Sequence, residues 1–128
     1  MADRQKTLKT PITLRGVGLH TGELAQLIIN PAPENHGYKF QRTDLDAQPI
    51  IDADVDNVVG TQRGTTLEQH GARVHTTEHV LAALYGMEID NALIQLDGPE
   101  VPILDGSSKP FIDAINSVGV EEQNADKN

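Results

Sequence analysis

The densest cluster of side chains able to bind a metal or move a proton is His75-Thr-Thr-Glu78-His79. It matches the pattern H-x-x-E-H, in which two histidines four residues apart on a helix bind Zn²⁺ and the neighbouring glutamate activates water. That chemistry requires His75 to lie on the helix, one turn before His79. Thr76 and Thr77 are instead typical of residues that cap a helix, which places His75 at the end of a preceding strand. The two-histidine chelate is therefore the less favoured interpretation.

A second interpretation keeps only Glu78 and His79. Adjacent residues in the first turn of a helix diverge by about 100°, yet from the N-terminal end both can converge on one ion beyond the helix. The helix dipole favours a carboxylate or a hydroxide at that end. On the residues alone an ordinary structural role is still favoured, because glutamate in a first turn complements the dipole and a lone histidine is usually on the surface.

Three further segments are polar or rich in glycine. The segment GVGLHTG (16–22) lacks the spacing and the following helix of a phosphate loop, so it predicts a tight connection between two strands, with His20 either exposed or near a site. The loop TQRGTT (61–66) suits the lining of a substrate site and a solvated turn equally. The segment DGSS (105–108) predicts the start of a helix.

Hydrophobic periodicity predicts the elements around these segments. Strands are expected, in chain order, at 8–14, 24–29, 38–43, 49–55, 65–67, 72–74, 92–96 and 101–104. Apolar stripes predict helices at 77–85 and 109–118, ended by Gly86 and Gly119. Strands that mostly precede the helices indicate an α+β fold: a two-layer sandwich with a mostly antiparallel or mixed sheet covered on one face by two helices.

Composition narrows the class of protein. The chain has 128 residues, 38% of them hydrophobic and 23% charged, which indicates one soluble globular domain. Aromatic residues make up only 3%, so the core is aliphatic and a stacking platform for single-stranded nucleic acid is not expected. The formal charge of -9 is opposite to that of a nucleic-acid binder. Residues 1–43 carry six basic and three acidic side chains, so an anionic ligand would meet this third or a part of the protein outside the chain.

Residue types and segments that are absent also restrict the function. Without cysteine, any metal must be held by histidine and carboxylate. No run approaches the roughly 20 apolar residues of a membrane span, and the N-terminal residues have no apolar signal region, so a cytoplasmic protein is expected. We predict a domain over residues 1–120 followed by a polar tail over 121–128, frayed or the start of an interdomain linker.

Four segments together resemble a known family. GVGLHTG (16–22), TTEHVLAAL (76–84), GMEIDNALI (86–94) and PEVPILDGSSKPF (99–111) resemble, in this order, the N-terminal half of UDP-3-O-acyl-N-acetylglucosamine deacetylase, the zinc amidohydrolase of lipid A synthesis. The resemblance implies that His79 is a zinc ligand and that Glu78 is the general base that takes a proton from the attacking water. It also implies a substrate cleft lined by Leu19, His20, Thr61, Arg63 and Thr65, with Asp105 close to it.

The same resemblance implies that the site is incomplete in this chain. The family takes two more zinc ligands from an H-K-x-x-D motif of a second domain, and no histidine here begins that motif. We therefore expect the chain to need the missing C-terminal domain and to be inactive alone. The resemblance implies a fold that pairs two such domains through their helical layers, so an isolated half is expected to expose that face and either to self-associate or to have that face loosened.

Two other functions stay open. The first is a self-contained metallohydrolase that uses His75, Glu78 and His79 with a third ligand such as Asp105 or His20. The second is a non-catalytic interaction domain whose acidic C-terminal part binds a basic partner.

Overall fold

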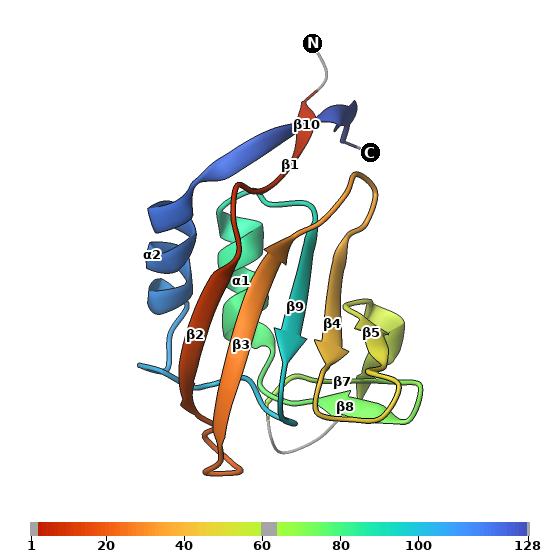
Figure 1. Cartoon of the computed structure of the whole chain (residues 1–128), viewed down its shortest axis with the longest axis vertical. Coiled ribbons are helices and arrows are strands. Elements are labelled where there is room, and N and C mark those ends of the chain that lie inside the picture. Colours follow the sequence, from red (N-terminus) through yellow and green to blue (C-terminus); the bar gives the residue numbers. More distant parts are fainter. Residues whose placement is uncertain (1–2, 60–63, 128) are drawn as a thin grey trace.

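The central sheet is built from segments in which buried and partly exposed residues alternate. The computed structural model describes residues 3–59 and 64–127. The five strands lie in the order β2 (Ile12–Val17), β3 (Leu24–Pro31), β9 (Ala92–Leu96), β4 (Tyr38–Arg42) and β5 (Ile50–Asp52). Neighbouring strands are antiparallel except β9 and β4, which are parallel (Figure 1). In β3, Ala25, Leu27 and Ile29 are buried, because alternate residues of a strand face the same side.

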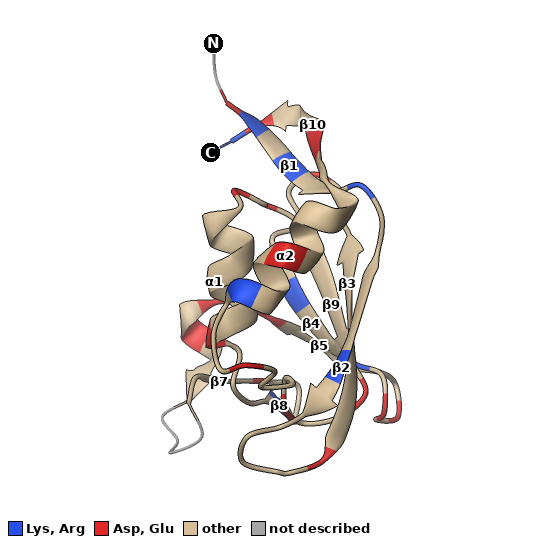
Figure 2. Ribbon diagram, turned by 90° about the vertical axis from the view of Figure 1, so that its left-hand side faces the viewer, with Lys and Arg blue, Asp and Glu red and all other residues tan. Residues whose placement is uncertain are grey.

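Two helices form a second layer against one face of this sheet. They are α1 (Glu78–Gly86) and α2 (Lys109–Val118), and the view turned by 90° separates both from the strands (Figure 2). Val80 and Leu84 of α1 and Phe111 and Ile115 of α2 are fully buried in the core that the two layers share. The expected α+β two-layer sandwich is confirmed.

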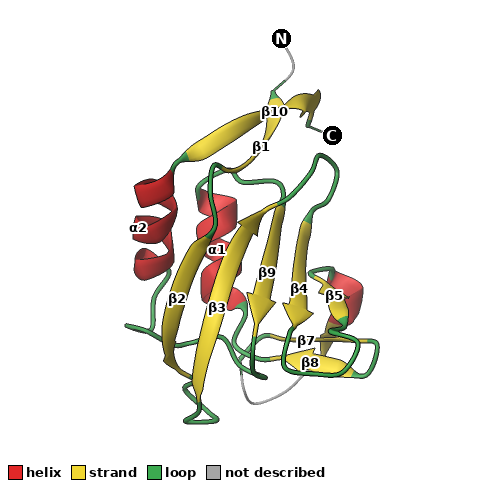
Figure 3. Ribbon diagram, viewed as in Figure 1, coloured by secondary structure: helices red, strands yellow, loops and turns green. Residues whose placement is uncertain are grey.

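Two smaller sheets flank the sandwich (Figure 3). One contains β6 (Val58–Val59), β7 (Thr66–Gln69) and β8 (Ala72–Val74), and it follows the 3₁₀ turn η1 (Val55–Asn57). In the other, β1 (Arg4–Leu8) pairs antiparallel with β10 (Val120–Asp126). Neither α1 nor α2 has the length and apolar character needed to cross a membrane, a finding that covers the described residues only.

The structure corrects three expectations about the strands. The strand expected at 8–14 is divided between β1 and β2, because Pro11 has no amide hydrogen for a continuous ladder. Residues 101–104 form no strand, since Leu104 has a positive φ of 53°. The frayed tail expected from 121 is wrong through Asp126, because β10 pairs its backbone with β1 and needs no apolar side chains to do so. The division into a domain over 1–120 and a polar segment over 121–128 stays a prediction.

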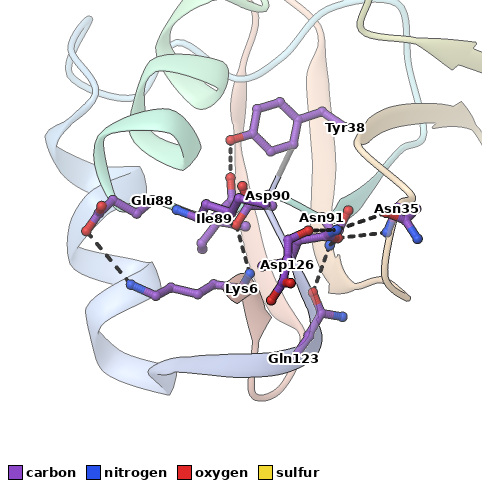
Figure 4. Close-up of polar contacts among 11 residues, drawn as sticks. Lys6, Asn35, Tyr38, Glu88, Ile89, Asp90, Asn91, Gln123 and Asp126 are labelled. Atoms are coloured by element: carbon purple, nitrogen blue, oxygen red, sulfur yellow. Dashed lines mark hydrogen bonds and ion pairs between the residues drawn. The ribbon is translucent and has the colours of Figure 1, made fainter. Parts of the chain in front are cut away.

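A buried amide joins the β1–β10 pair to the sandwich. The side chain of Asn91, just before β9, accepts a hydrogen bond from the Gly37 amide at 2.8 Å. Its Nδ2 donates to Oε1 of Gln5 on β1 at 2.9 Å and to Oε1 of Gln123 on β10 at 2.7 Å (Figure 4). Asn91 therefore connects both terminal strands to the turn before β4.

Candidate functional site

The start of α1 is fixed by the loop that precedes β7. Thr77 occupies the N-cap position, as expected, but its hydroxyl caps no amide of the helix. The amide and the hydroxyl of Thr77 instead both donate to the carbonyl of Thr65, each at 3.1 Å. His75 lies before the helix in a parallel bridge with Glu100, so the expectation that it lies off the helix is confirmed.

Glu78 is the first residue of α1, and the same loop touches its carboxylate. The amide of Thr65 donates to Oε1 of Glu78 at 3.2 Å, across 13 residues of sequence. Gly64 lies beside the other oxygen, where a Cβ would come within 2.8 Å of Oε2. The structure thus brings Glu78 and Thr65 together. Thr61 and Arg63, also expected in the cleft, lie outside the described residues.

His79 follows Glu78 in the first turn of α1 and is partly buried. Among residues 3–59 and 64–127, no three histidine, aspartate or glutamate side chains are grouped so that they could hold a metal ion. The ring of His75 is buried and its Nδ1 is hydrogen-bonded to the hydroxyl of Thr66 at 2.8 Å. The described part of the chain fits one imidazole ligand with a carboxylate next to it, and the helical chelate of His75 and His79 is not formed.

Glu100 is the residue of this region that sequence reasoning missed. Glu100 is only 1% exposed, and its carboxylate accepts hydrogen bonds from the amides of His20 at 3.0 Å and Thr21 at 2.9 Å. Its other oxygen accepts from the hydroxyl of Thr76 at 2.6 Å. Burial raises the pKa of Glu100, but the hydrogen bonds from Thr76, Thr21 and His20 outweigh it, so the pKa lies below its usual value. The only signal in the sequence is an acidic residue inside the otherwise apolar run around Val101.

The glycine-rich segment 16–22 closes the turn between β2 and β3, as expected. The amide of Gly22 donates to the carbonyl of Gly18 at 3.0 Å. A Cβ on Gly18 would lie 2.2 Å from Oε1 of Glu100, so only glycine allows this approach. Leu19 is 60% exposed, and His20 is exposed while its backbone amide is bound by Glu100.

The four segments that suggested a family are thus divided between the two ends of α1. Residues 16–22, 76–84 and 99–111 meet around Glu100 at the N-terminal end of the helix. The segment 86–94 begins at its C-terminal end and includes Asn91. Asp105 is exposed and accepts from the amide and the hydroxyl of Ser107 in the turn before α2, which confirms the expected helix start there.

The sequence matches a family model and several known proteins. Residues 5–128 match the family model described as LpxC: UDP-3-O-acyl N-acetylglycosamine deacetylase. The bifunctional enzyme LpxC/FabZ of Bacteroides thetaiotaomicron is 56% identical over 124 residues, which are 97% of this chain and 27% of that protein. The UDP-3-O-acyl-N-acetylglucosamine deacetylases of Myxococcus xanthus and Methylococcus capsulatus are 53% and 50% identical over 124 residues each. The aligned residues make up 96% and 97% of this chain but only 39% and 41% of those two proteins.

Proposed function

Because the chain belongs to the UDP-3-O-acyl N-acetylglycosamine deacetylase family, we propose that it forms the N-terminal part of a zinc-dependent amidohydrolase. The substrate is UDP-3-O-acyl-N-acetylglucosamine, and the reaction is the removal of its acetyl group in lipid A biosynthesis. In this proposal Glu78 is the general base and His79 is one zinc ligand. The remaining ligands come from a C-terminal domain outside this chain, and a cytoplasmic location stays a prediction.

The observation that carries the proposal is the contact of Gly64 and Thr65 with the carboxylate of Glu78. The Thr65 amide donates a hydrogen bond to Oε1 of Glu78. Because glycine has no side chain, Oε2 can lie close to Gly64. A carboxylate that accepts a single amide hydrogen bond from the described residues suits a group that must take a proton from a water molecule. Its place at the N-terminal end of α1 favours negative charge in the reaction.

The chemistry requires one proton acceptor from this chain. The oxygen of water attacks the carbonyl carbon of the acetamide, and Glu78 accepts the proton that the water loses. When the C–N bond breaks, that proton passes to the sugar nitrogen, so acetate and a free amine leave. Zinc, when bound, polarises the carbonyl and makes the water more acidic. Leu19, His20 and Thr65 would contact the substrate, and so would Thr61 and Arg63.

The experiment is an assay of acetate release from UDP-3-O-acyl-N-acetylglucosamine. The chain alone should release none, and the chain joined to the remaining sequence of the deacetylase should be active. In the joined enzyme Glu78→Gln should lower kcat by about 100-fold or more, because the amide cannot accept the proton. Glu88→Gln, at an exposed residue just beyond the C-terminal end of α1, is the matched control and should leave kcat unchanged.

Two results would favour the other functions. Turnover by the chain alone would favour a self-contained metallohydrolase. Full activity of the joined enzyme with Glu78→Ala would favour a non-catalytic acidic interaction domain.

A further inference from the structure

Three segments that are distant in the sequence are held by one buried side chain. Glu100 accepts hydrogen bonds from the amides of His20 and Thr21 in the β2–β3 loop. It also accepts one from the hydroxyl of Thr76 in the turn before α1. We propose that Glu100 is a positioning residue that fixes the loop bearing Leu19 and His20 relative to the helix bearing Glu78 and His79. This inference rests on the proposed deacetylase function, since it concerns the distance between substrate-binding and proton-accepting groups.

The burial of Glu100 is the first argument. Glu100 is 1% exposed, and the burial of its charge away from water is unfavourable unless hydrogen bonds replace the water. Here the replacing donors are two backbone amides and one hydroxyl, all from other parts of the chain. This cost favours one geometry, because a shift of the loop or of Thr76 removes at least one of the donors on which the buried charge depends.

The backbone of Thr76 is the second argument. Thr76 has a φ of +60°, in the left-handed region that β-branched residues rarely adopt. Its hydroxyl lies 2.6 Å from Oε2 of Glu100, and it stands two residues before Glu78. The strained turn directs the chain from the bridge at His75 into α1. Glu100 therefore stabilises the backbone conformation that sets the direction of the first helical turn.

The backbone around Glu100 is the third argument. The amide of His75 donates to the carbonyl of Pro99 at 2.8 Å, and the amide of Val101 donates to the carbonyl of His75 at 3.1 Å. On the other side, the amide of Ile103 donates to the carbonyl of Val17 at 2.9 Å. The segment 99–103 is thus fastened to both partners, and its one buried carboxylate connects them.

Kinetics of the joined deacetylase test this role. Glu100→Ala should lower kcat/KM by about ten- to a hundredfold, because a misplaced group costs rate even when it is remote from the chemistry. Glu100→Gln should stay within about threefold of the wild type, because its Oε1 can accept both amides and its Nε2 can donate to the Thr76 hydroxyl. Glu23→Ala, an exposed glutamate of the same loop, is the matched control and should have no effect.

A double-mutant cycle separates positioning from general loss of stability. His20→Ala should lower kcat/KM by less in the Glu100→Ala enzyme than in the wild type, since the loop is already displaced. Strictly additive effects of His20→Ala and Glu100→Ala would overturn the proposal.

Amide hydrogen exchange of the 128-residue chain provides a test that does not depend on activity. Glu100→Ala should speed exchange at His20 and Thr21 at least tenfold and leave the amides of β9 unchanged. If Glu100→Ala does not fold, Thr76→Val removes one donor at nearly constant volume and should speed the same two amides. Unchanged exchange in the variant that folds would overturn the proposal. A different pair of results separates the two proposals. If the wild-type joined enzyme is inactive but exchange at His20 and Thr21 is faster in the variant, the deacetylase function is overturned, whereas the anchoring of the loop by Glu100 stands.

Discussion

A Cβ on Gly64 would lie 2.8 Å from Oε2 of Glu78, closer than real Cβ atoms come to other heavy atoms, and 3.1 Å from Oε1, which is a tight contact. Gly64 also has a φ of +74°, which favours glycine for a separate reason. The absence of a side chain therefore serves both the turn and the carboxylate that we propose as the general base.

Gly64→Ala should lower kcat of the joined deacetylase about tenfold or more, because the methyl group must displace the carboxylate of Glu78. Gly71→Ala is the control, since Gly71 has a φ of +76° with nothing within 4 Å of its Cβ position. Both changes should cost about 1 kcal/mol of stability through backbone strain. Thermal unfolding and acetate release measured together check the pair, and equal activity of the two variants would contradict the contact.

His79 should be the zinc ligand of this chain and His75 should not. In a calorimetric titration of the chelator-stripped chain at neutral pH, zinc should bind weakly, because one imidazole is a poor site without further ligands. His79→Ala should abolish that binding and His75→Ala should leave it unaltered, with circular dichroism to verify the fold of each variant. Tight binding that is lost in both variants would instead support the self-contained metallohydrolase.

Asp44 should make stability depend on pH. Two hydrogen bonds from the buried Arg42, at 2.9 and 2.7 Å, hold the pKa of the Asp44 carboxyl below its usual value. The ionised carboxylate of Asp44 therefore stabilises the folded state. This advantage is fully present above the pKa of the carboxyl in the unfolded chain, about 3.9. The advantage is lost as the pH falls through the lower pKa of the folded state.

Asp44→Asn should accordingly lower the free energy of unfolding by about 1 kcal/mol at pH 7, and the difference from the wild type should shrink toward zero in acid. Urea unfolding at a series of pH values measures it. The exposed Asp46→Asn serves as control. A difference between wild type and Asp44→Asn that is constant with pH would show that the ionised carboxylate is not the stabilising species.

Asn91→Ala should destabilise the chain by about 3 kcal/mol, because Gly37, Gln5 and Gln123 would each lose a buried hydrogen-bond partner. Asn91→Asp should be similarly harmful, since a carboxylate can accept from Gly37 but cannot donate to the two glutamines. Denaturant unfolding gives the free energies, and amide exchange should speed along β10. Asn116→Ala, on the exposed side of α2, should be close to neutral, and an equally small effect at Asn91 would contradict its anchoring role.

The chain alone should self-associate through its helical layer. Tyr85 of α1 is 80% exposed, and it belongs to the helical layer that the missing C-terminal domain is expected to cover. Tyr85→Lys should shift sedimentation toward the monomer, whereas Val55→Lys, at a residue that is 81% exposed outside the helical layer, should not. A compact monomer at high concentration in analytical ultracentrifugation would count against the prediction.

Local periodicity was sufficient for most of the sandwich. The strand expected at 92–96 and the helix expected at 109–118 have the observed bounds, because each buries one regular apolar face. The polar strand β10 lacks that signal, since its pairing with β1 depends on backbone groups from the opposite end of the chain. The pattern of side chains predicted which strands and helices exist, but it did not predict which distant strands pair with each other.

The candidate site was predictable only in part for the same reason. The pattern at 75–79 identified Glu78 and His79 as residues of interest, and the caps before them correctly placed His75 off the helix. The bond between Thr65 and Glu78 crosses the β7–β8 hairpin, and no spacing rule encodes it. Glu100 depends entirely on donors from two other segments, so its importance emerges only from the folded chain.

The pairing of Leu8 with Val120 also has a kinetic consequence. The two strands close a loop that contains nearly the whole chain, and such closure carries the largest entropic cost of any contact in the molecule. Pairs that are close in the sequence, such as the β7–β8 hairpin, close much shorter loops, so we expect the β1–β10 pair to form after them.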